Sequence, residues 1–451
     1  TAATKIDIKL SANKDGKLTA VKAKLMFDAG AFPGSPVAGG SRTMLGPYVI
    51  PNAVVEGWDV VTNVQKSSAY RAPGSPSAAF AMETVVDEIA KQLNIDPIEF
   101  RRINGAKEGT RQPANGPVYR KIGYMETLDA AKNHPHYSTP LNHKNQGRGI
   151  AAGAWFNFTG PATAIVSVNA DGTVALVEGS PDIGGSRAAM AMQVADVLGL
   201  KSEDVQPSIA STDSIGYSSG AGGSSVTFKT GIASVEAAED IKIQMKERAA
   251  KIWDVDVNDV EYDKSKIKHV SDPELKFEFR ELAAKLNGTG GPIVGRATVN
   301  PGGVGNAFAI HIVDVEVDSE TGKVEILRYT SIQDVGKAIH PSYVEGQLQG
   351  GAVQGIGWAL NEEYFFNENG DMLNSSFLDY RMPVSLDLPM IDTVLVEVAN
   401  PGHPFGVRGV GEACLIPPMA AIANAINDAI GIRMNELPMS PGKIVKSLGE
   451  I

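Results

Sequence analysis

The chain has 451 residues, of which 43% are hydrophobic and 21% charged, a composition typical of a globular protein long enough to form two lobes. Its 41 basic and 52 acidic residues give a net charge of −11, which argues against general nucleic-acid binding. A single cysteine, Cys414, excludes an internal disulfide and any iron–sulfur cluster held by this chain alone. No apolar run reaches the ~18 residues that cross a bilayer, so we expect no membrane span and a cytoplasmic location.

The first block, residues 1–104, opens with alternating apolar and polar residues on both sides of the Asp15-Gly turn, which predicts a β-hairpin. A strand is predicted around 54–61. Apolar residues at helical spacing then predict a helix over 79–93, capped by Ser75 or Ser77. The stretch that starts Asp96-Pro-Ile-Glu predicts a second, short helix. A hairpin with no preceding element indicates a sheet that begins elsewhere: either the sequence is a fragment of a longer chain, or a separate chain supplies the other half.

Residues 105–146 are polar and rich in Gly, Pro, Asn and Lys, with only a weak helix signal over 125–132. We interpret them as a linker, with the alternative that part of the stretch packs on a neighbouring element. The third block, 147–451, has hairpin patterns over 164–178 and 308–329. Helical patterns cover 188–198, 235–253, 344–360 and 418–430. Hairpins mixed with helices, rather than strict strand–helix alternation, predict an α+β or mixed α/β fold.

Glycines gather in short loops that tend to precede helical segments, including those at Gly74, Gly184, Gly222 and Gly411. Glycine lets backbone N–H groups approach an anion closely, and a helix N-terminus behind them adds positive potential. Each loop can equally be an ordinary turn, and none is a Walker or Rossmann motif. The loops by themselves therefore indicate no more than an anion-binding centre.

Glu412 has apolar residues on both sides in the sequence Gly409-Val-Gly-Glu-Ala. A carboxylate in apolar surroundings has a raised pKa and can act as a general base near neutral pH. The alternative is a glutamate that precedes a helix starting at about Pro418 and faces its dipole. The residues alone leave both explanations open.

Longer blocks add information: Tyr70-Arg-Ala-Pro-Gly-Ser-Pro, Asp96-Pro-Ile-Glu-Phe-Arg-Arg, Gln333-Asp-Val-Gly-Lys, Val344-Glu-Gly-Gln, and Gly409-Val-Gly-Glu-Ala with Leu415-Ile-Pro-Pro-Met. Together, in this order, they resemble the molybdopterin-binding part of the xanthine dehydrogenase/aldehyde oxidase family of molybdenum hydroxylases. The resemblance implies a two-lobed architecture. Residues 1–104 would be the remainder of a first molybdopterin-binding domain, and 147–451 a second domain with the catalytic glutamate.

The resemblance also implies an activity and a site. Glu412 would be the catalytic base of an oxidoreductase that inserts water-derived oxygen at an electron-poor carbon of an N-heteroaromatic ring or an aldehyde. The implied cofactor contacts are Arg71, Ala72, Gly74, Gly184, Gly222, Gly223, Ser224, Gln347 and Gly411, with the metal held through the pterin dithiolene and by no side chain. Phe156 and Phe158 would line the pocket of a flat substrate, although core packing is the alternative role. Pro73 would replace an aromatic wall found in xanthine-oxidising members.

Three features depart from the family pattern. The family's glycine-rich pterin loop and the glutamine that approaches molybdenum lie upstream of residue 1, Gly185 replaces a frequent glutamine, and Ala72 replaces the cysteine of aerobic carbon monoxide dehydrogenases. We therefore expect a split subunit, with Thr1 left after removal of an initiator methionine. Expected partners are a second molybdopterin-binding chain, a 2Fe-2S subunit and an FAD subunit, with the cofactor in its cytosine dinucleotide form. The alternative is a scaffold subunit that has lost the cofactor.

Overall fold

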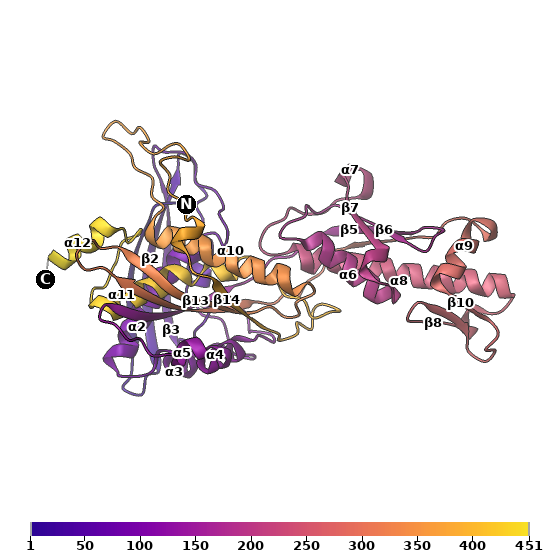
Figure 1. The fold of residues 1–451 in the computed structure, drawn as a ribbon, viewed down its shortest axis with the longest axis horizontal. Helices are drawn as coiled ribbons and strands as arrows, with labels where there is room; N and C mark the ends of the chain where they lie inside the picture. The colour runs from indigo at the N-terminus through magenta and orange to yellow at the C-terminus, as the bar shows by residue number, and fades with distance from the viewer. Residues whose placement is uncertain (1, 450–451) are drawn as a thin grey trace.

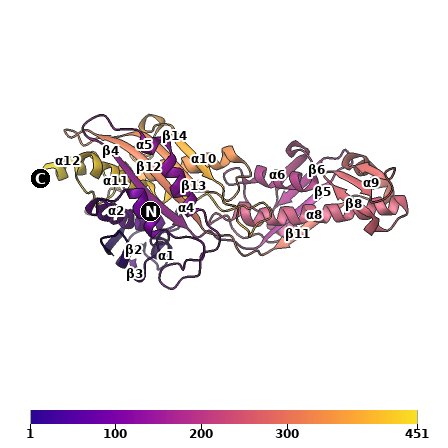
Figure 2. The same ribbon diagram turned by 90° about the horizontal axis from the view of Figure 1, so that it is seen from below.

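The computed structural model describes residues 2–449 and has two lobes arranged along one long axis (Figure 1). The chain builds most of the first lobe up to β4, forms the second lobe from β5 to β11, and returns to the first lobe at β12. A view turned by 90° shows the same division (Figure 2). The mixed α/β, two-lobed architecture is thus confirmed. Residues 147–451 contribute to both lobes, and the division into cofactor-binding domains at 104 and 146 stays a prediction. Thr1 lies outside the described residues.

The predicted N-terminal hairpin is present. β1 (Thr4–Ala12) pairs antiparallel with β2 (Leu18–Gly30), and β3 (Asn52–Val61) adds parallel to β2. The inward side chains of β2 pack against α2 (Ser75–Gln92). Gly74, with φ 80°, precedes this helix, and no side chain caps it, so the expected serine cap is wrong. The remaining helices of this block are α1 (Val37–Thr43) and α3 (Pro97–Asn104).

A four-stranded sheet forms the centre of the first lobe, with the order β14 (Ile391–Val396), β13 (Val324–Asp334), β12 (Ala307–Val317), β4 (Gln146–Trp155). Along β12, Val313 and Val315 join the apolar cluster of α10 (Pro341–Leu360) and α11 (Pro418–Ile430). Ile310 and Ile312 join the cluster that contains α4 (Tyr124–Asn133). Because successive strand residues face opposite sides, helices cover both faces of this sheet.

Two glycines of β4 allow α11 to approach the sheet closely. A Cβ at Gly149 would lie 1.9 Å from the carbonyl oxygen of Ala421, and one at Gly147 would lie 2.2 Å from that of Ala425. Any larger residue would force the helix away from the strand. This contact fixes α11, which follows Glu412 after a short 3-10 turn at Ala413–Leu415.

The polar stretch 105–146, which we interpreted as a linker, packs into the first lobe. It contains α4 and the short α5 (Pro135–Ser138), and its Tyr119, Tyr124 and Leu128 are buried against the central sheet. This agrees with the alternative that part of the stretch packs on a neighbouring element, and a few large apolar side chains supply the contact. The segment is therefore part of the body and not an exposed tether.

One segment among residues 2–449, Ala413–Ile430, is long and apolar enough to cross a membrane, contrary to our expectation that no run would reach that length. It includes α11, and 78% of it is buried inside the protein. Its apolar residues are therefore accounted for by packing against the central sheet.

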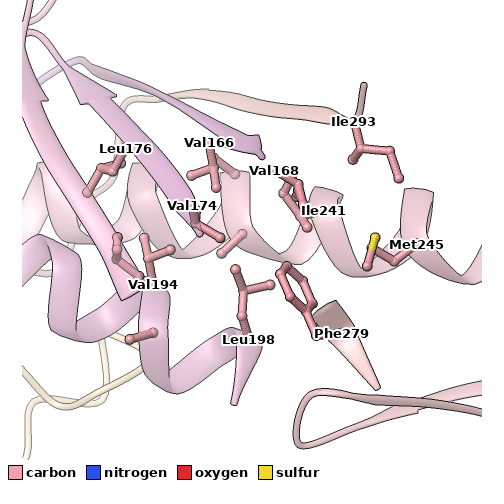
Figure 3. Close-up of a cluster of buried hydrophobic side chains, with 14 of the residues drawn as sticks. Val166, Val168, Val174, Leu176, Val194, Leu198, Ile241, Met245, Phe279 and Ile293 are labelled. Atoms are coloured by element: carbon pink, nitrogen blue, oxygen red, sulfur yellow. The ribbon is translucent and has the colours of Figure 1, made fainter. Parts of the chain in front are cut away.

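The second lobe is a four-stranded sheet covered by α6 (Ser186–Leu198) and α8 (Val226–Trp253). Inward side chains from the sheet, α6 and α8 meet in its core, as Val166, Val194 and Ile241 illustrate (Figure 3). The strand order is β11 (Val294–Val299), β5 (Ala162–Val168), β6 (Val174–Glu178), β7 (Val205–Ile209). Smaller elements complete the chain: β8 (Val260–Asp263), β9 (Lys266–His269), β10 (Lys276–Glu278), α7 (Thr212–Ile215), α9 (Phe279–Thr289) and α12 (Pro441–Gly449).

Candidate cofactor and active site

A cavity of about 670 Å³ lies where the two lobes meet. The second lobe contributes the loops before α6 and α8, and the first lobe contributes the loop before α2, the start of α10, and the segment that ends at Glu412. These segments are 69–73, 183–186, 221–227, 337–347 and 407–412. The glycine-rich loops that stand out in the sequence therefore converge on one space.

Three long helices begin at this cavity. The residues before their first turns are Gly185 for α6, Ser225 for α8 and His340 for α10, and none of these residues forms a side-chain cap. The first backbone N–H groups of a helix have no partner within the helix, and the helix dipole places positive potential there. The cavity is therefore suited to an anionic ligand on more than one side.

Glycine is required where the two lobes approach each other across this cavity. A Cβ at Gly184 would lie 2.6 Å from the side-chain nitrogen of Gln347, and Gly184 has a φ of 60°. A Cβ at Gly223 would lie 2.3 Å from the ring of Phe158, and Gly223 has a φ of 64°. Both glycines have a positive φ, and both lie so close to a neighbouring side chain that a Cβ would clash with it.

Glu412 faces the cavity, partly exposed, with both carboxylate oxygens bound. The backbone N–H of Ala72 donates to Oε1 at 3.1 Å, and the hydroxyl of Ser224 donates to Oε2 at 2.8 Å. Burial raises the pKa of Glu412, while the bonds from Ser224 and Ala72 and the charge of Arg71 lower it in part. The net result is a raised pKa in a fixed carboxylate, as a general base requires.

Trp155, the last residue of β4, forms a wall of the same cavity next to Glu412. Its ring is 4% exposed and makes an edge-to-face contact with Phe158 at 5.8 Å between centroids. The indole N–H faces the Glu412 carboxylate and lowers its pKa, but it makes no hydrogen bond of good geometry to any described residue. The indole nitrogen is itself buried and faces Glu412, so its effect is on the charge of that carboxylate.

Arg71 joins the loop before α2 to the elements that hold Glu412. Its guanidinium donates to the carbonyl oxygen of Gly411, to Oε1 of Gln354 at 2.9 Å, and to the carbonyl oxygen of Gln347 at 3.0 Å. Its N–H groups are thus largely occupied by the protein. The residue holds the segment before Glu412 against α10, in addition to lining the cavity.

The segment 407–411 is fixed along its length. Arg408 and Asp334 form a fully buried ion pair at 3.1 Å. The side-chain amides of Asn157 and Gln333 donate to the carbonyl oxygens of Gly409 and Val410, at 3.2 and 2.9 Å. Contacts from β13 and from the loop after β4 therefore hold the backbone that presents Glu412.

Most of the residues expected at the site line this cavity: Arg71, Pro73, Phe158, Gly184, Gly222, Gly223, Ser224, Gln347, Gly411 and Glu412. Ala72 and Gly74 do not line it. Ala72 binds Glu412 through its backbone, and Gly74 packs against Pro36, whose carbonyl oxygen would lie 2.2 Å from an added Cβ. Phe156 also lies outside the lining and packs under the guanidinium of Arg42 at 5.1 Å.

Sequence patterns did not single out Trp155, Tyr70 or His340 as candidates, although all three line the cavity. His340 could have been found from its position directly before the apolar helix that begins at Pro341. Trp155 is buried at the end of an apolar strand, where its role depends on tertiary contacts.

A family model for the molybdopterin cofactor-binding domain matches residues 119–389, and a second model of the same description matches residues 1–105. This chain belongs to the molybdopterin cofactor-binding family. Since the first match alone covers more than half of the chain, the family resemblance of its blocks is confirmed.

Relatives in this family extend the match over nearly the whole chain. It is 29% identical to the xanthine dehydrogenase molybdenum-binding subunit of Escherichia coli O157:H7, over 97% of this chain and 61% of the relative. It is 28% identical to the nicotine 6-hydroxylase large subunit of Paenarthrobacter nicotinovorans, over 98% of this chain and 59% of the relative. Quinoline 2-oxidoreductase of Pseudomonas putida 86 has the same fold, with a TM-score of 0.87 and 24% sequence identity. The match covers 99% of this chain and 62% of that structure's chain. The molybdopterin-binding chain described here thus spans about three fifths of the length of these relatives.

Proposed function

We propose that this chain is the catalytic-base part of the molybdopterin-binding subunit of a molybdenum hydroxylase, an oxidoreductase active in a multi-subunit complex. The observation that carries the proposal is Glu412, a carboxylate with a raised pKa, held by two hydrogen bonds at a cavity suited to an anionic ligand. A scaffold subunit without cofactor would have no use for a base in this setting.

The residues of the cavity fit a molybdopterin cofactor. The starts of α8 and α10 would hold its phosphate and ring heteroatoms, together with Gly184, Gly222, Gly223 and Gln347. Ser224 and Gly411 would lie beside them. At α6, the carboxylate of Asp182 already accepts from the backbone N–H of Arg187. When bound, the cofactor supplies oxygen transfer to the substrate and accepts its electrons. The cytosine dinucleotide form remains part of this proposal.

Glu412 would take up the proton released as water-derived oxygen is transferred to the substrate. Ala72 and Ser224 keep the carboxylate in one orientation, and burial keeps its pKa high enough for the proton to be accepted. Arg71 and Arg408 keep the backbone around Glu412 in place. The chain's own contribution is therefore a preorganised base.

The cavity walls favour a flat, apolar substrate. Trp155, Phe158 and Ile183 supply apolar surface. An N-heteroaromatic ring or an aldehyde brings the electron-poor carbon that the proposed reaction requires. Relatives are named for nicotine 6-hydroxylation and quinoline 2-oxidoreduction. Pro73 lines the cavity at the position where xanthine-oxidising members of the family would have an aromatic side chain, so the pocket is wider there.

The relatives include a protein named as a large subunit and one named as subunit gamma of a dehydrogenase complex. We propose that this chain likewise works with partners: a second molybdopterin-binding chain, a 2Fe-2S subunit and an FAD subunit, all in the cytoplasm. Cys414 is the only cysteine, so electrons would leave through clusters and flavin on those other chains.

The proposal is tested by Glu412→Gln in the native complex, with quinoline, nicotine and benzaldehyde as substrates and a dye as electron acceptor. We expect kcat to fall by roughly 10²- to 10⁴-fold, the usual contribution of a general base. Molybdenum content should not change, because glutamine keeps the size of the side chain: its amide oxygen can still accept from the N–H of Ala72, and its NH2 group can donate to the hydroxyl oxygen of Ser224. A fully active variant would contradict the assigned role of Glu412.

A further inference from the structure

Two consecutive glycines at the start of α6 face two side chains of α10 where the lobes meet. α6 belongs to the second lobe, and α10 extends from the first lobe toward it (Figure 1). A Cβ at Gly184 would lie 2.6 Å from the side-chain nitrogen of Gln347, and a Cβ at Gly185 would lie 2.2 Å from the ring of Tyr343. Gln347 and Tyr343 are four residues apart and share one face of α10. The ring of Tyr343 thus fills the space that a side chain at position 185 would need.

The ring of Tyr343 is held in one orientation. It stacks on the ring of His340, with 3.8 Å between the centroids and 8° between the planes. Nδ1 of His340 lies 3.3 Å from the hydroxyl of Ser342, and the backbone N–H of Tyr343 donates to the carbonyl oxygen of His340 at 3.1 Å. The stack covers one face of the tyrosine ring, and Gly185 lies along its edge.

The hydroxyl of Tyr343 is available to a bound molecule. Tyr343 is 46% exposed and lines the cofactor cavity. Within residues 2–449, its hydroxyl makes no hydrogen bond. A phenol hydroxyl can both donate and accept a hydrogen bond. The cavity wall therefore contains a fixed aromatic ring whose polar group has no protein partner in this part of the chain.

Backbone donors on the α6 side of the cavity are partly in use. The N–H of Ser186 donates to the carbonyl oxygen of Ile183 at 3.2 Å, and the N–H of Arg187 donates to the carboxylate of Asp182 at 3.1 Å. That carboxylate also places negative charge beside the start of the helix. An anionic ligand on this side consequently needs a donor from another element, and Tyr343 of α10 is placed to supply one.

We propose that Tyr343 is a further cofactor-binding residue, an inference that rests on the proposed function. Its hydroxyl donates a hydrogen bond to an acceptor atom of the molybdopterin cofactor, and His340 is the positioning residue that holds the ring. Trp155 and Phe158, which supply apolar surface for the substrate, lie on β4 and the loop after it. Tyr343 lies one helical turn from Gln347, which the proposed function places against the cofactor. The hydroxyl is therefore assigned to the cofactor and not to the substrate.

The test is Tyr343→Phe in the native complex, isolated through a tag on the full chain. Phenylalanine keeps the ring and its stack and removes only the hydroxyl. Molybdenum, by elemental analysis, and the pterin, by fluorescence after oxidation, are followed during dialysis at a low urea concentration that leaves the complex assembled. We expect release of both to be about tenfold faster, as for the loss of one hydrogen bond to a charged group. The matched control, Tyr364→Phe, changes a tyrosine that is 51% exposed outside the cavity lining and should release them at the unaltered rate.

The outcomes separate this inference from the proposed function. Equal release from the Tyr343→Phe complex and the unaltered complex would overturn the inference alone. A higher KM with an unchanged release rate would assign the hydroxyl to the substrate and would overturn it as well. An unaltered complex without molybdenum would contradict the proposed function, and the inference would fall with it. Recovery of the same subunits in the same amounts shows that the variants fold.

A second experiment tests the place of the ring beside Gly185, whose φ is 78°. Asparagine tolerates a positive φ and is favoured directly before a helix, so the Tyr343 ring is what opposes it at this position. Gly185→Asn should therefore lower the molybdenum content of the complex by displacing the ring. In a Tyr343→Ala background, the same change should cause no further loss, because the clash is gone. An equal loss in both backgrounds would overturn the assignment of this space to the ring.

Discussion

Burial raises the pKa of Glu412 and of Glu178, which lie in different settings. Glu412 lies at the cavity and accepts hydrogen bonds from Ala72 and Ser224, which moderate the effect. Glu178, at the end of β6, lies in the second lobe with no partner for either oxygen among the residues described, and burial raises its pKa to about 8. The first group is therefore a candidate base and the second is a neutral acid at physiological pH.

Ser224→Ala should shift the pH dependence of kcat/KM. The hydroxyl donates to the charged form of Glu412 and lowers its pKa, so its loss raises that pKa further. The acid limb, where the base becomes protonated as the pH falls, should move up by about 0.5–1 pH unit, equivalent to one hydrogen bond of about 1 kcal/mol. Ser234→Ala, on α8 but outside the cavity lining, should leave the profile unchanged. An unmoved acid limb in the Ser224 variant would argue against titration of Glu412.

Glu178→Gln should change how stability depends on pH. Because the folded pKa of Glu178 is raised, the folded state holds a proton that the unfolded state loses, and stability falls as the pH rises from about 4.5 to 8. The glutamine variant should lose this dependence and be more stable than the unaltered chain at pH 8.5, by on the order of 1–3 kcal/mol. Urea unfolding at pH 5 and pH 8.5 measures the difference. Equal slopes in the two proteins would show that Glu178 does not titrate in this range.

At the scale of elements, the position of Glu412 depends on α11 lying close to β4. Gly149→Ala places a Cβ 1.9 Å from the carbonyl oxygen of Ala421 and should cost about 1–3 kcal/mol or more of unfolding free energy. Gly288→Ala, in α9 with no atom within 4 Å of the added Cβ, should be neutral or slightly stabilising. Thermal unfolding of the two variants compares these effects. Equal stability would mean that the helix moves away from the strand at little cost.

The elements that sequence predicted well are those whose apolar pattern is local. The hairpin of β1 and β2 and the helices α2, α10 and α11 are confirmed close to their predicted bounds. α8 begins at Val226, earlier than the predicted 235, because its first turns contain β-branched residues and glycine that only tertiary packing makes helical. α9 was missed because its capping box uses Glu278 in place of serine or threonine.

The site was predictable only where a motif marked it. The segment around Glu412 indicated a base, but its partners Ala72 and Ser224 lie 340 and 188 residues away in the chain, and no local pattern links them. Trp155 was missed for the same reason, since its unpaired N–H becomes visible only when β4 is placed beside Glu412. A motif can therefore identify a single site residue, but only the fold shows which distant residues contact it.

At the scale of the whole molecule, the cavity belongs to neither lobe alone. The helices that begin at the cavity come from both lobes, and Glu412 comes from the C-terminal part of the first lobe. The chain spans about three fifths of the length of its relatives. We therefore expect tight cofactor binding only in the assembled complex.

The most direct test is the molybdenum content, by elemental analysis, of the native complex isolated through this chain and of the full chain expressed alone. The account predicts about one molybdenum per chain in the complex, bound as the pterin cofactor, and little in the isolated chain. An intact complex without molybdenum would contradict it. Glu412 would then be a buried glutamate without a reaction to serve, and the chain a scaffold of the same fold.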